Sequence, residues 1–478
     1  MCPTFFLTTI YYKSYSYYFV LAIQELGTLN MKKVATLSVE SCAKQNELEN
    51  LYSTAEDMGN INLTDSIVVN IKEKLDHSAT SDTSDCYIYR VPKNVRELNE
   101  AAYTPLLVSI GPYHYGERRL QPMEEFKMSY CKKFIESTNI SVENYVEHVK
   151  LYEERARKCY EANLNITSLD FVTMILVDAC FILEFMLRSQ YTKLRQADDD
   201  LPSMQLKRIH INHDLVLLEN QLPYFILDSI YRLDHPRFRT LWKEIYPNLS
   251  DLVSSFFNKY AQHDVPRIFK RPIMHFTDFI RTLHEPKRNN WDNENYEDSK
   301  FIVSATQLYD AGVKFQMVHE KCLLDVDFEN QTLLIPRFEL NDDKESLFRN
   351  LVALELHHYP YDTFIIDYFV FMDTLIDTSY DISLLVQNGV LNRTGDYWGA
   401  AHSFNNFCAG ITHYNATSYL NPIHRKLNEH CKEPTHTLVA TLKHDYFSTP
   451  FKTASTIAAI LLLMLTLVST VCSIIPIL

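Results

Sequence analysis

Residues 453–478, at the end of the chain, contain no charged side chain. As an α-helix this segment would be about 39 Å long, whereas the hydrocarbon core of a bilayer is about 30 Å thick. A stretch so long and so free of charge predicts a single C-terminal transmembrane helix. Lys443 and Lys452 precede it, and no basic residue follows it. The positive-inside rule therefore predicts that the body lies in the cytosol. We expect a single-pass protein of the plasma membrane or an endomembrane.

The predicted membrane helix carries a stripe of hydroxyl side chains at helical spacing. The stripe consists of Thr466, Ser469, Thr470 and Ser473. Hydroxyls inside a membrane can hydrogen-bond to a second helix, which would make this stripe the contact of a homodimer. They can instead bond to carbonyls of their own helix. The sequence leaves both arrangements open.

Residues 1–85 are predicted to be a largely flexible leader, because 33–85 are polar and rich in Ser, Thr, Asp and Asn. The apolar stretch 5–23 is interrupted by Lys13 and lacks the basic start of a signal peptide. Seven N-x-S/T sequons leave the opposite topology open, because their glycosylation would place the body outside the cytosol. They lie at Asn62, Asn139, Asn165, Asn248, Asn330, Asn392 and Asn415.

Composition argues against several classes of function. The formal charge is −14 without a dense basic cluster, which argues against a nucleic-acid partner. None of the nine glycines forms a G-x-G-x-x-G motif, and Glu117 and Arg118 stand where a phosphate loop needs Lys and Ser or Thr. The ten cysteines form no C-x-x-C pair, and His210 with His213 lacks a third ligand. We therefore predict no cofactor and no metal.

The fold is predicted to be mainly α: a large helical body at 86–450 with a small antiparallel β-meander at 313–336. Apolar residues recur at helical spacing as far as residue 284, and again after the meander. The charged stretch 284–300 predicts an exposed loop, and Gly312 is expected to stop a short helix. Within 313–336, short alternating runs meet at a tight connection, Glu329-Asn330-Gln331.

Polar residues interrupt two stretches that otherwise read as buried helices. Asp178 and Glu184 lie in "LDFVTMILVDACFILEFML", and Glu219, Asn220 and Gln221 lie in "HDLVLLENQLPYFIL", where Pro223 is expected to end the helix. Buried carboxylates cost several kcal/mol unless they are paired, so we expect a structural polar network. Its predicted members are Asp178, Glu184, Asp214, Glu219, Asn220 and Gln221, with Lys127 as a counter-ion.

Two further interpretations concern a site. Glu184 and Glu219 could act as a general acid and base, which would make the protein a membrane-tethered hydrolase. The stretch "AAYTPLLVSIGPYHYG" contains Tyr113, His114 and Tyr115, which could line a cleft or form a packed aromatic turn. No nucleophile motif accompanies either feature. We therefore prefer a membrane-tethered interaction or recognition protein with an unknown protein partner.

The chain resembles the plant family called domain of unknown function 247. The matching motifs are Val91-Pro92, Tyr103-Thr104-Pro105, Ser109 to His114, Met123-Glu124 and Lys127, followed by "DACFILEFML", "HDLVLLENQLPYFIL", "ATQLYDAGVKF", "NLVALE" and "YFVFMDTLIDT". The resemblance covers about 86–478 and implies a plant-specific, single-pass membrane protein without assigned catalytic residues. Some grass members of that family look like pollen-side determinants of self-incompatibility, which implies that recognition is a role open to the fold.

Overall fold

The computed structural model describes residues 68, 71–72, 87–138, 140–161, 164–191, 202–233, 246–260, 271–286, 303–319, 322–393, 407, 418–433 and 450–474. The chain divides into two compact units, Met1–Ser84 and Asp85–Leu478. In the first unit the described residues are Val68, Ile71 and Lys72, which are exposed. The predicted leader therefore lies almost wholly outside the described residues, as does most of the predicted loop at 284–300.

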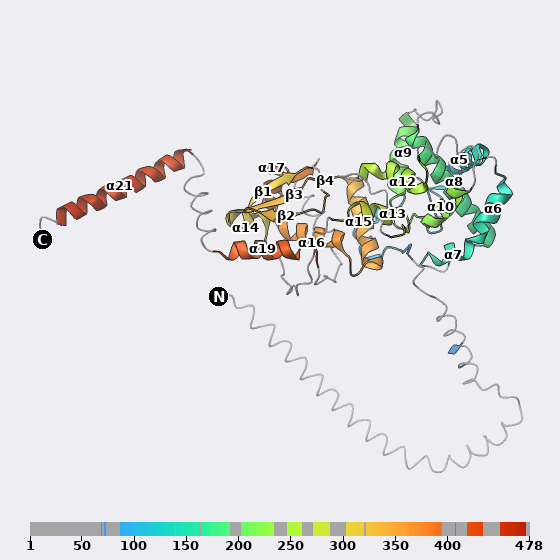
Figure 1. Ribbon diagram of the computed structural model, residues 1–478, viewed down its shortest axis with the longest axis horizontal. Helices are drawn as coiled ribbons and strands as arrows, with labels where there is room; N and C mark the ends of the chain where they lie inside the picture. The colour runs from blue at the N-terminus through green and yellow to red at the C-terminus, as the bar shows by residue number, and fades with distance from the viewer. Residues whose placement is uncertain are drawn as a thin grey trace, which may run out of the picture. The chain divides into compact units, whose positions relative to one another are not determined.

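The second unit is mainly helical, as predicted, and α8 (Ser168–Gln190) lies at the centre of its N-terminal part (Figure 1). Thr167 begins α8 by accepting a hydrogen bond from the backbone N–H of Asp170 at 3.1 Å. Because α8 is apolar on nearly every face, it has to be covered from all sides. The helices that cover it are α5 (Glu124–Thr138), α6 (Val142–Leu151), α7 (Glu153–Lys158), α10 (Tyr224–Arg232) and α12 (Leu249–Phe257).

The predicted helix over 213–222 is wrong. Helix α9 (Pro202–Asp214) ends at Asp214, and residues 215–223 form a buried segment of turns before α10 begins. Pro223 immediately precedes α10, so it stands at the start of a helix instead of ending one. The apolar side chains of the segment are buried as expected, which is why composition alone resembled a core helix.

Strands form at 313–336 as predicted, but they make a mixed sheet and not an antiparallel meander. β1 (Lys314–Val318) pairs in parallel with β3 (Thr332–Pro336), which pairs antiparallel with β2 (Asp327–Glu329). Residues 319–331 provide the chain length that a parallel crossover needs. The tight connection is confirmed, because Asn330 and Gln331 both have positive φ and form a two-residue hairpin turn.

The C-terminal part of the body continues with helices and one two-stranded parallel sheet, β4 (Phe338–Leu340) with β5 (Leu391–Arg393). Its helices are α13 (Phe276–Leu283), α14 (Ala305–Asp310), α15 (Asp342–His358), α16 (Phe364–Leu375), α17 (Ser379–Gln387) and α19 (Asn421–Lys432). Gly312 follows α14 with φ +86°, so it stops that helix as predicted. One hydrophobic core runs from Ile88 to Leu427.

Further short helical segments lie in the described part of the body. They are α4 (Lys93–Arg96), η2 (Glu100–Tyr103), η3 (Gln121–Met123) and η6 (Asn258–Tyr260). The first three belong to the stretch that carries the opening family motifs.

The C-terminal apolar helix, α21 (Pro450–Ile474), begins at Pro450 where the sequence predicted 453. Its stretch Pro450–Val471 has a mean hydropathy of 2.2, and none of it is buried. By length and composition this helix could cross a membrane. The hydroxyls of Thr466 and Thr470 each donate to the carbonyl four residues earlier at 2.7 Å, so they bond within their own helix. The homodimer through this stripe stays a prediction.

Candidate functional site

The buried segment after α9 has no helical ladder, so its backbone groups need other partners. The side-chain amide of Gln221 donates to the carbonyls of Leu215 and Leu217, both at 2.8 Å. The amide of Asn220 donates to the carbonyl of Asp214 at 3.0 Å. These side chains therefore replace hydrogen bonds that a helix would have made.

The same two amides also join the segment to its neighbours. Asn220 donates to the carbonyl of Val108 at 3.1 Å and accepts from the backbone N–H of Ile110 at 2.8 Å. Gln221 accepts from the backbone N–H of Phe276, the first residue of α13, at 2.9 Å. A substitution of Asn220 or Gln221 would therefore leave buried backbone groups without hydrogen-bond partners, both in this segment and in the segment it contacts.

Two contributors to this arrangement were missed by the sequence analysis. Asn350 accepts from the backbone N–H of Leu218 at 2.9 Å, and Thr277 donates to the carbonyl of Val216 at 3.0 Å. Asn350 left a signal, since it is a polar residue in the apolar run "LFRNLVALE" of α15. Thr277 left none.

Asp214, the last residue of α9, holds the extended stretch that begins at 105. Its carboxylate accepts from three successive backbone N–H groups, those of Leu106 and Leu107 at 2.6 Å and of Val108 at 2.8 Å. Hydrogen bonds to a carboxylate are about twice as strong as neutral ones. Asp214 thus fixes the path of a loop that has no regular structure of its own.

Asp178 and Lys127 form a buried ion pair between α8 and α5. The ammonium of Lys127 has three acceptors: Asp178 Oδ1 at 2.6 Å, Glu124 Oε1 at 2.9 Å and the carbonyl of Ser109 at 2.8 Å. Asp178 Oδ2 accepts from the backbone N–H of Gly111 at 2.8 Å. The pair therefore anchors residues 109–111 to both helices.

Burial raises the pKa of the Asp178 carboxyl to about 6, although Lys127 and the N–H of Gly111 favour its charged form. Burial alone would lower the pKa of Lys127, but Asp178 and Glu124 outweigh it and raise that pKa. Near neutral pH both groups are charged, so the pair is an ion pair buried in the core.

Glu219 connects the irregular segment to the start of the body. One carboxylate oxygen accepts from the backbone N–H of Val91 and the other bonds Arg96, both at 2.6 Å. The Nε2 atom of His114 lies 3.6 Å from the second oxygen. Two features that the sequence analysis treated separately, Glu219 and the loop at 113–115, therefore lie side by side.

Glu184 does not share a site with Glu219. It lies on α8 and bonds Arg188, one turn further on, at 2.6 Å. Both glutamates are buried, and each has an arginine as partner. The solvent-open pair of carboxylates that the hydrolase interpretation requires is not formed by these two residues.

The loop at 113–115 does not present its three side chains to one cleft. Tyr113 is buried, and its hydroxyl donates to the carbonyl of Ile88 at 2.8 Å. His114 is buried, with Nδ1 at 2.6 Å from Glu117, and burial lowers its pKa even though Glu117 and Glu219 oppose that effect. Tyr115 is 41% exposed. The arrangement is that of the packed turn, from which Tyr115 alone projects.

The C-terminal part contains a further buried ion pair, which sequence reasoning missed. Arg281 of α13 bonds Glu355 of α15 at 2.9 Å, and Glu355 accepts from the N–H groups of Ile365 and Ile366 at the start of α16. Burial raises the pKa of Glu355, and Arg281 and the two N–H groups counteract that rise by favouring the charged carboxylate. Arg281 and Glu355 are far apart in sequence, so no local sequence pattern predicts that they form a pair.

No group of three or more His, Cys, Asp or Glu side chains could hold a metal ion within the part of the chain that the structure describes. His213 of the predicted histidine pair has Nδ1 at 3.2 Å from Asp214 and Nε2 at 3.0 Å from Ser346. Its ring nitrogens already have protein partners.

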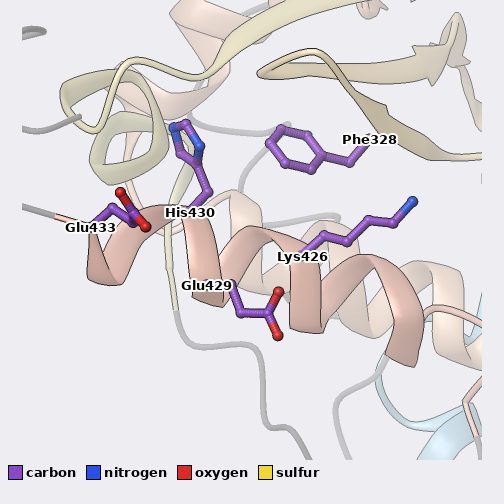
Figure 2. Close-up of a pocket in the computed structure, with 5 residues that line it drawn as sticks. All are labelled: Phe328, Lys426, Glu429, His430 and Glu433. Atoms are coloured by element: carbon purple, nitrogen blue, oxygen red, sulfur yellow. The ribbon is translucent and has the colours of Figure 1, made fainter. Parts of the chain in front are cut away.

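A pocket of about 330 Å³ lies between α19 and β2 (Figure 2). It is lined by Phe328, Lys426, Glu429, His430 and Glu433. The rings of His430 and Phe328 lie edge to face with centroids 5.8 Å apart, whereas Glu429 points away from both rings (Figure 2). Nε2 of His430 is 3.1 Å from the carbonyl of Ala311. The pocket is open, and its charged groups do not converge on one point.

The fold and this network define a class: a predominantly helical body, held by side-chain to backbone hydrogen bonds, with one exposed apolar helix towards its C-terminus. The chain belongs to the plant family of proteins of unknown function DUF247, whose sequence model matches residues 88–465. The motifs quoted above from 91 to 127, with "DACFILEFML" and "HDLVLLENQLPYFIL", supply most of the network.

Two relatives come from Arabidopsis thaliana and carry the name UPF0481 protein. One is 29% identical over 425 residues, which cover 80% of this chain and 85% of the relative. The other is 22% identical over 497 residues, covering 83% of this chain and 92% of the relative. No solved structure matches the chain significantly.

We expect Glu219→Leu to lower the free energy of unfolding by about 2–3 kcal/mol, because it strands the N–H of Val91 and the guanidinium of Arg96. Denaturant titration of the full chain in mild detergent would measure this. Glu117→Ala should cost far less. However, Glu117 is half-buried and bonds His114, so its substitution also removes a contact of the network. Glu136→Leu is the better control, because Glu136 forms an exposed ion pair with Lys132 outside the network. If the Glu219 and Glu136 variants unfold alike, the network does not stabilise the body.

Proposed function

We propose that this chain is a C-terminally anchored membrane protein whose body faces the cytosol and acts by binding a protein partner. The observation that carries the anchor is α21, in which the stretch Pro450–Val471 is strongly apolar and has no buried residue. Exposing so many apolar side chains to water is costly, and a bilayer would remove that cost.

The charge distribution supports the cytosolic orientation. Lys443 and Lys452 lie on the N-terminal side of the apolar stretch, and the residues after it carry no charge. Basic residues near a membrane helix favour the cytosolic side. The body precedes the helix and so shares that side.

The state of the buried carboxylates supports binding more than catalysis. Asp178, Glu184 and Glu219 are each buried and paired with a cation. Asp214 is occupied by backbone N–H groups. These groups position the loop at 105–116 and the segment at 215–223. On this proposal the network holds a rigid surface for a partner.

The anchor is tested by extracting plant membranes with alkaline carbonate. We expect the full chain to stay in the pellet and the double variant Leu463→Arg/Leu467→Arg to become soluble. Each arginine at the centre of a membrane helix costs about 2.5–3.5 kcal/mol. Leu463→Ile/Leu467→Ile is the matched control, which should stay in the pellet. A wild-type chain found in the soluble fraction would refute the anchor.

The orientation is tested by treating the plant-expressed protein with an endoglycosidase. We expect no change in mobility, because a cytosolic body is not glycosylated. Asn165, Asn248, Asn330 and Asn392 are exposed, so they would accept glycans on the other side of the membrane. A shift by several glycans would place the body outside the cytosol and make an extracellular partner the leading hypothesis.

The binding role is tested by crosslinking in intact plant membranes. We expect a discrete product that differs in mass from both the monomer and the homodimer, and we expect it to be lost when the body is deleted and α21 is kept. Finding monomer and homodimer as the sole products would contradict a protein partner. This outcome is independent of the extraction and glycosidase results.

A further inference from the structure

The first described segment of the body, Tyr87 to Val91, joins it to the unit that ends at Ser84. Four of its backbone N–H groups are hydrogen-bonded, including that of Arg90, which donates to Glu161 at 2.8 Å. The N–H groups of Tyr87 and Ile88 donate to the carbonyl of Cys159 at 3.1 and 2.9 Å, and the N–H of Val91 donates to Glu219. The two tyrosine side chains of this segment, at 87 and 89, both contact histidines.

His275 contacts Tyr87, and its cap on α13 requires a neutral ring. Its Nδ1 accepts from the backbone N–H of Asp278 at 3.2 Å, which caps α13. Nδ1 must therefore carry a lone pair, so the ring proton is on Nε2, which lies 3.2 Å from the carbonyl of Tyr87. The two rings are also stacked, with centroids 6.1 Å apart.

His357 and His358, at the end of α15, hold Tyr89. The ring of His357 stacks on that of Tyr89 at a centroid distance of 5.0 Å and an interplanar angle of 13°. Nδ1 of His358 is 2.9 Å from the hydroxyl of Tyr89. Nε2 of His357 is buried without a hydrogen-bond partner. A proton added there would have no acceptor in the folded body.

We propose that His275, His357 and His358 form an acid-sensitive clamp around Tyr87 and Tyr89, which loosens residues 87–91 when these rings gain protons. A proton on Nδ1 of His275 would break its cap on α13. The clamp joins three parts of the chain that are distant in sequence: 87–89, α13 and α15. Opening would loosen residues 87–91 while the helices around α8 stay packed.

The charges around the clamp act on proton uptake in both directions, and the largest opposing effect is burial. Asp278 faces His275 and His358, and Glu161 faces His357; both carboxylates favour protonation. The positive charge of Arg271 disfavours protonation of His275 and His358, and that of Arg281 disfavours protonation of His358. Asp278 is already bonded by Arg271 at 2.8 and 3.2 Å and by Tyr359 at 2.7 Å, so little of its charge is free.

Burial lowers the pKa of all three histidines, and that of His275 falls to about 4. In the released state the rings meet water and return towards the ordinary value of 6.5. A lowered pKa stabilises the closed state above 6.5, and this stabilisation is lost as the pH falls through the folded value. The clamp should therefore open between 6.5 and about 4.

Hydrogen exchange of the full chain in mild detergent would test this, read on peptides covering 87–91. Beyond the intrinsic pH dependence of exchange, we expect opening to increase more than about tenfold between about pH 7.5 and about pH 5. The triple variant His275→Asn/His357→Phe/His358→Gln should show an increase below about threefold. Asn keeps a helix cap, Phe keeps the stack, and Gln keeps a hydrogen-bond partner for Tyr89.

The double variant His357→Phe/His358→Gln, which leaves α13 unchanged, should show an intermediate increase and serves if the triple variant does not fold. His148→Gln removes a half-buried histidine elsewhere and should behave as wild type. Peptides from α8 should stay protected throughout. An equal increase in wild type and double variant, no increase in wild type, or equal loss of protection in α8 would each overturn the clamp.

Discussion

Lys127→Met is expected to lower the free energy of unfolding by about 3–5 kcal/mol, the largest effect that we predict for a single substitution. Methionine has nearly the volume of lysine, so the core stays filled. What is lost is the cation, which has 1% of its side chain exposed and three acceptors. Asp178 would then be a buried carboxylate without a counter-ion, and the carbonyl of Ser109 would lose its donor.

The effect should shrink as the pH falls. Burial already raises the pKa of Asp178 to about 6 in the presence of Lys127, and loss of the cation raises it further. A carboxyl with a raised pKa stabilises the folded state when protonated, so the variant recovers stability below its new pKa. Denaturant titrations of both proteins at several pH values would measure the difference.

Lys132→Met is the matched control, because Lys132 lies on the same helix in an exposed pair with Glu136 at 3.7 Å. Exposed pairs contribute about 0–1 kcal/mol, so little change is expected. Adding Asp178→Asn to Lys127→Met should restore part of the loss. Equal effects of the two lysine substitutions would show that the Asp178 pair does not stabilise the core.

The elements that the sequence predicted well are those that depend on local chemistry. The helix around Asp178 and Glu184 is long and apolar throughout, which leaves few alternatives. Gly312 ends a helix and Asn330 begins a hairpin turn, because glycine and asparagine tolerate positive φ better than other residues. In each case the local residue type indicates the backbone conformation.

The segment at 215–223 was mispredicted for a physical reason. A buried helix and a buried coil require the same apolar side chains, so composition could not separate them. The two differ in how the backbone N–H and C=O groups are hydrogen-bonded. In a helix these groups bond to each other, whereas a buried coil needs polar side chains nearby. Asn220 and Gln221 fulfil that need here. Their presence in an apolar run was the signal of a coil.

Partners that are distant in sequence could not be predicted. The buried carboxylates at 178, 214 and 219 implied that hydrogen-bond partners exist, but the sequence did not identify those partners. Most turned out to be backbone N–H groups between 91 and 111, which have no sequence signature. The pairing of β1 with β3 is similar, because a parallel neighbour depends on how the intervening chain crosses the sheet.

Gly111→Ala should be the second most damaging substitution, by about 2–5 kcal/mol, because two penalties combine at this position. Gly111 has φ +71°, and a left-handed backbone costs other residues about 1–2 kcal/mol. A Cβ atom would also lie 2.6 Å from the carbonyl oxygen of Gln221 and 3.1 Å from the hydroxyl of Tyr160. Forcing atoms into a packed core adds about 1–3 kcal/mol.

The carbonyl of Gln221 cannot easily move aside. It accepts from the hydroxyl of Tyr160 at 3.0 Å. The side-chain amide of Gln221 also donates to the carbonyls of Leu215 and Leu217 and accepts from the N–H of Phe276, which fixes the residue in place. A shift would therefore disturb the whole irregular segment. Gly111 is required because two stretches of backbone approach each other here without room for a side chain.

Gly116→Ala separates the two penalties. Gly116 has φ +81° but no atom within 4 Å of an added Cβ, so its substitution carries the conformational cost alone, about 1–2 kcal/mol. Denaturant titration of the two variants side by side should show a clearly larger loss at position 111. Equal losses would mean that the contact with Gln221 adds nothing, and that the loop and the irregular segment are not packed as tightly as the distances require.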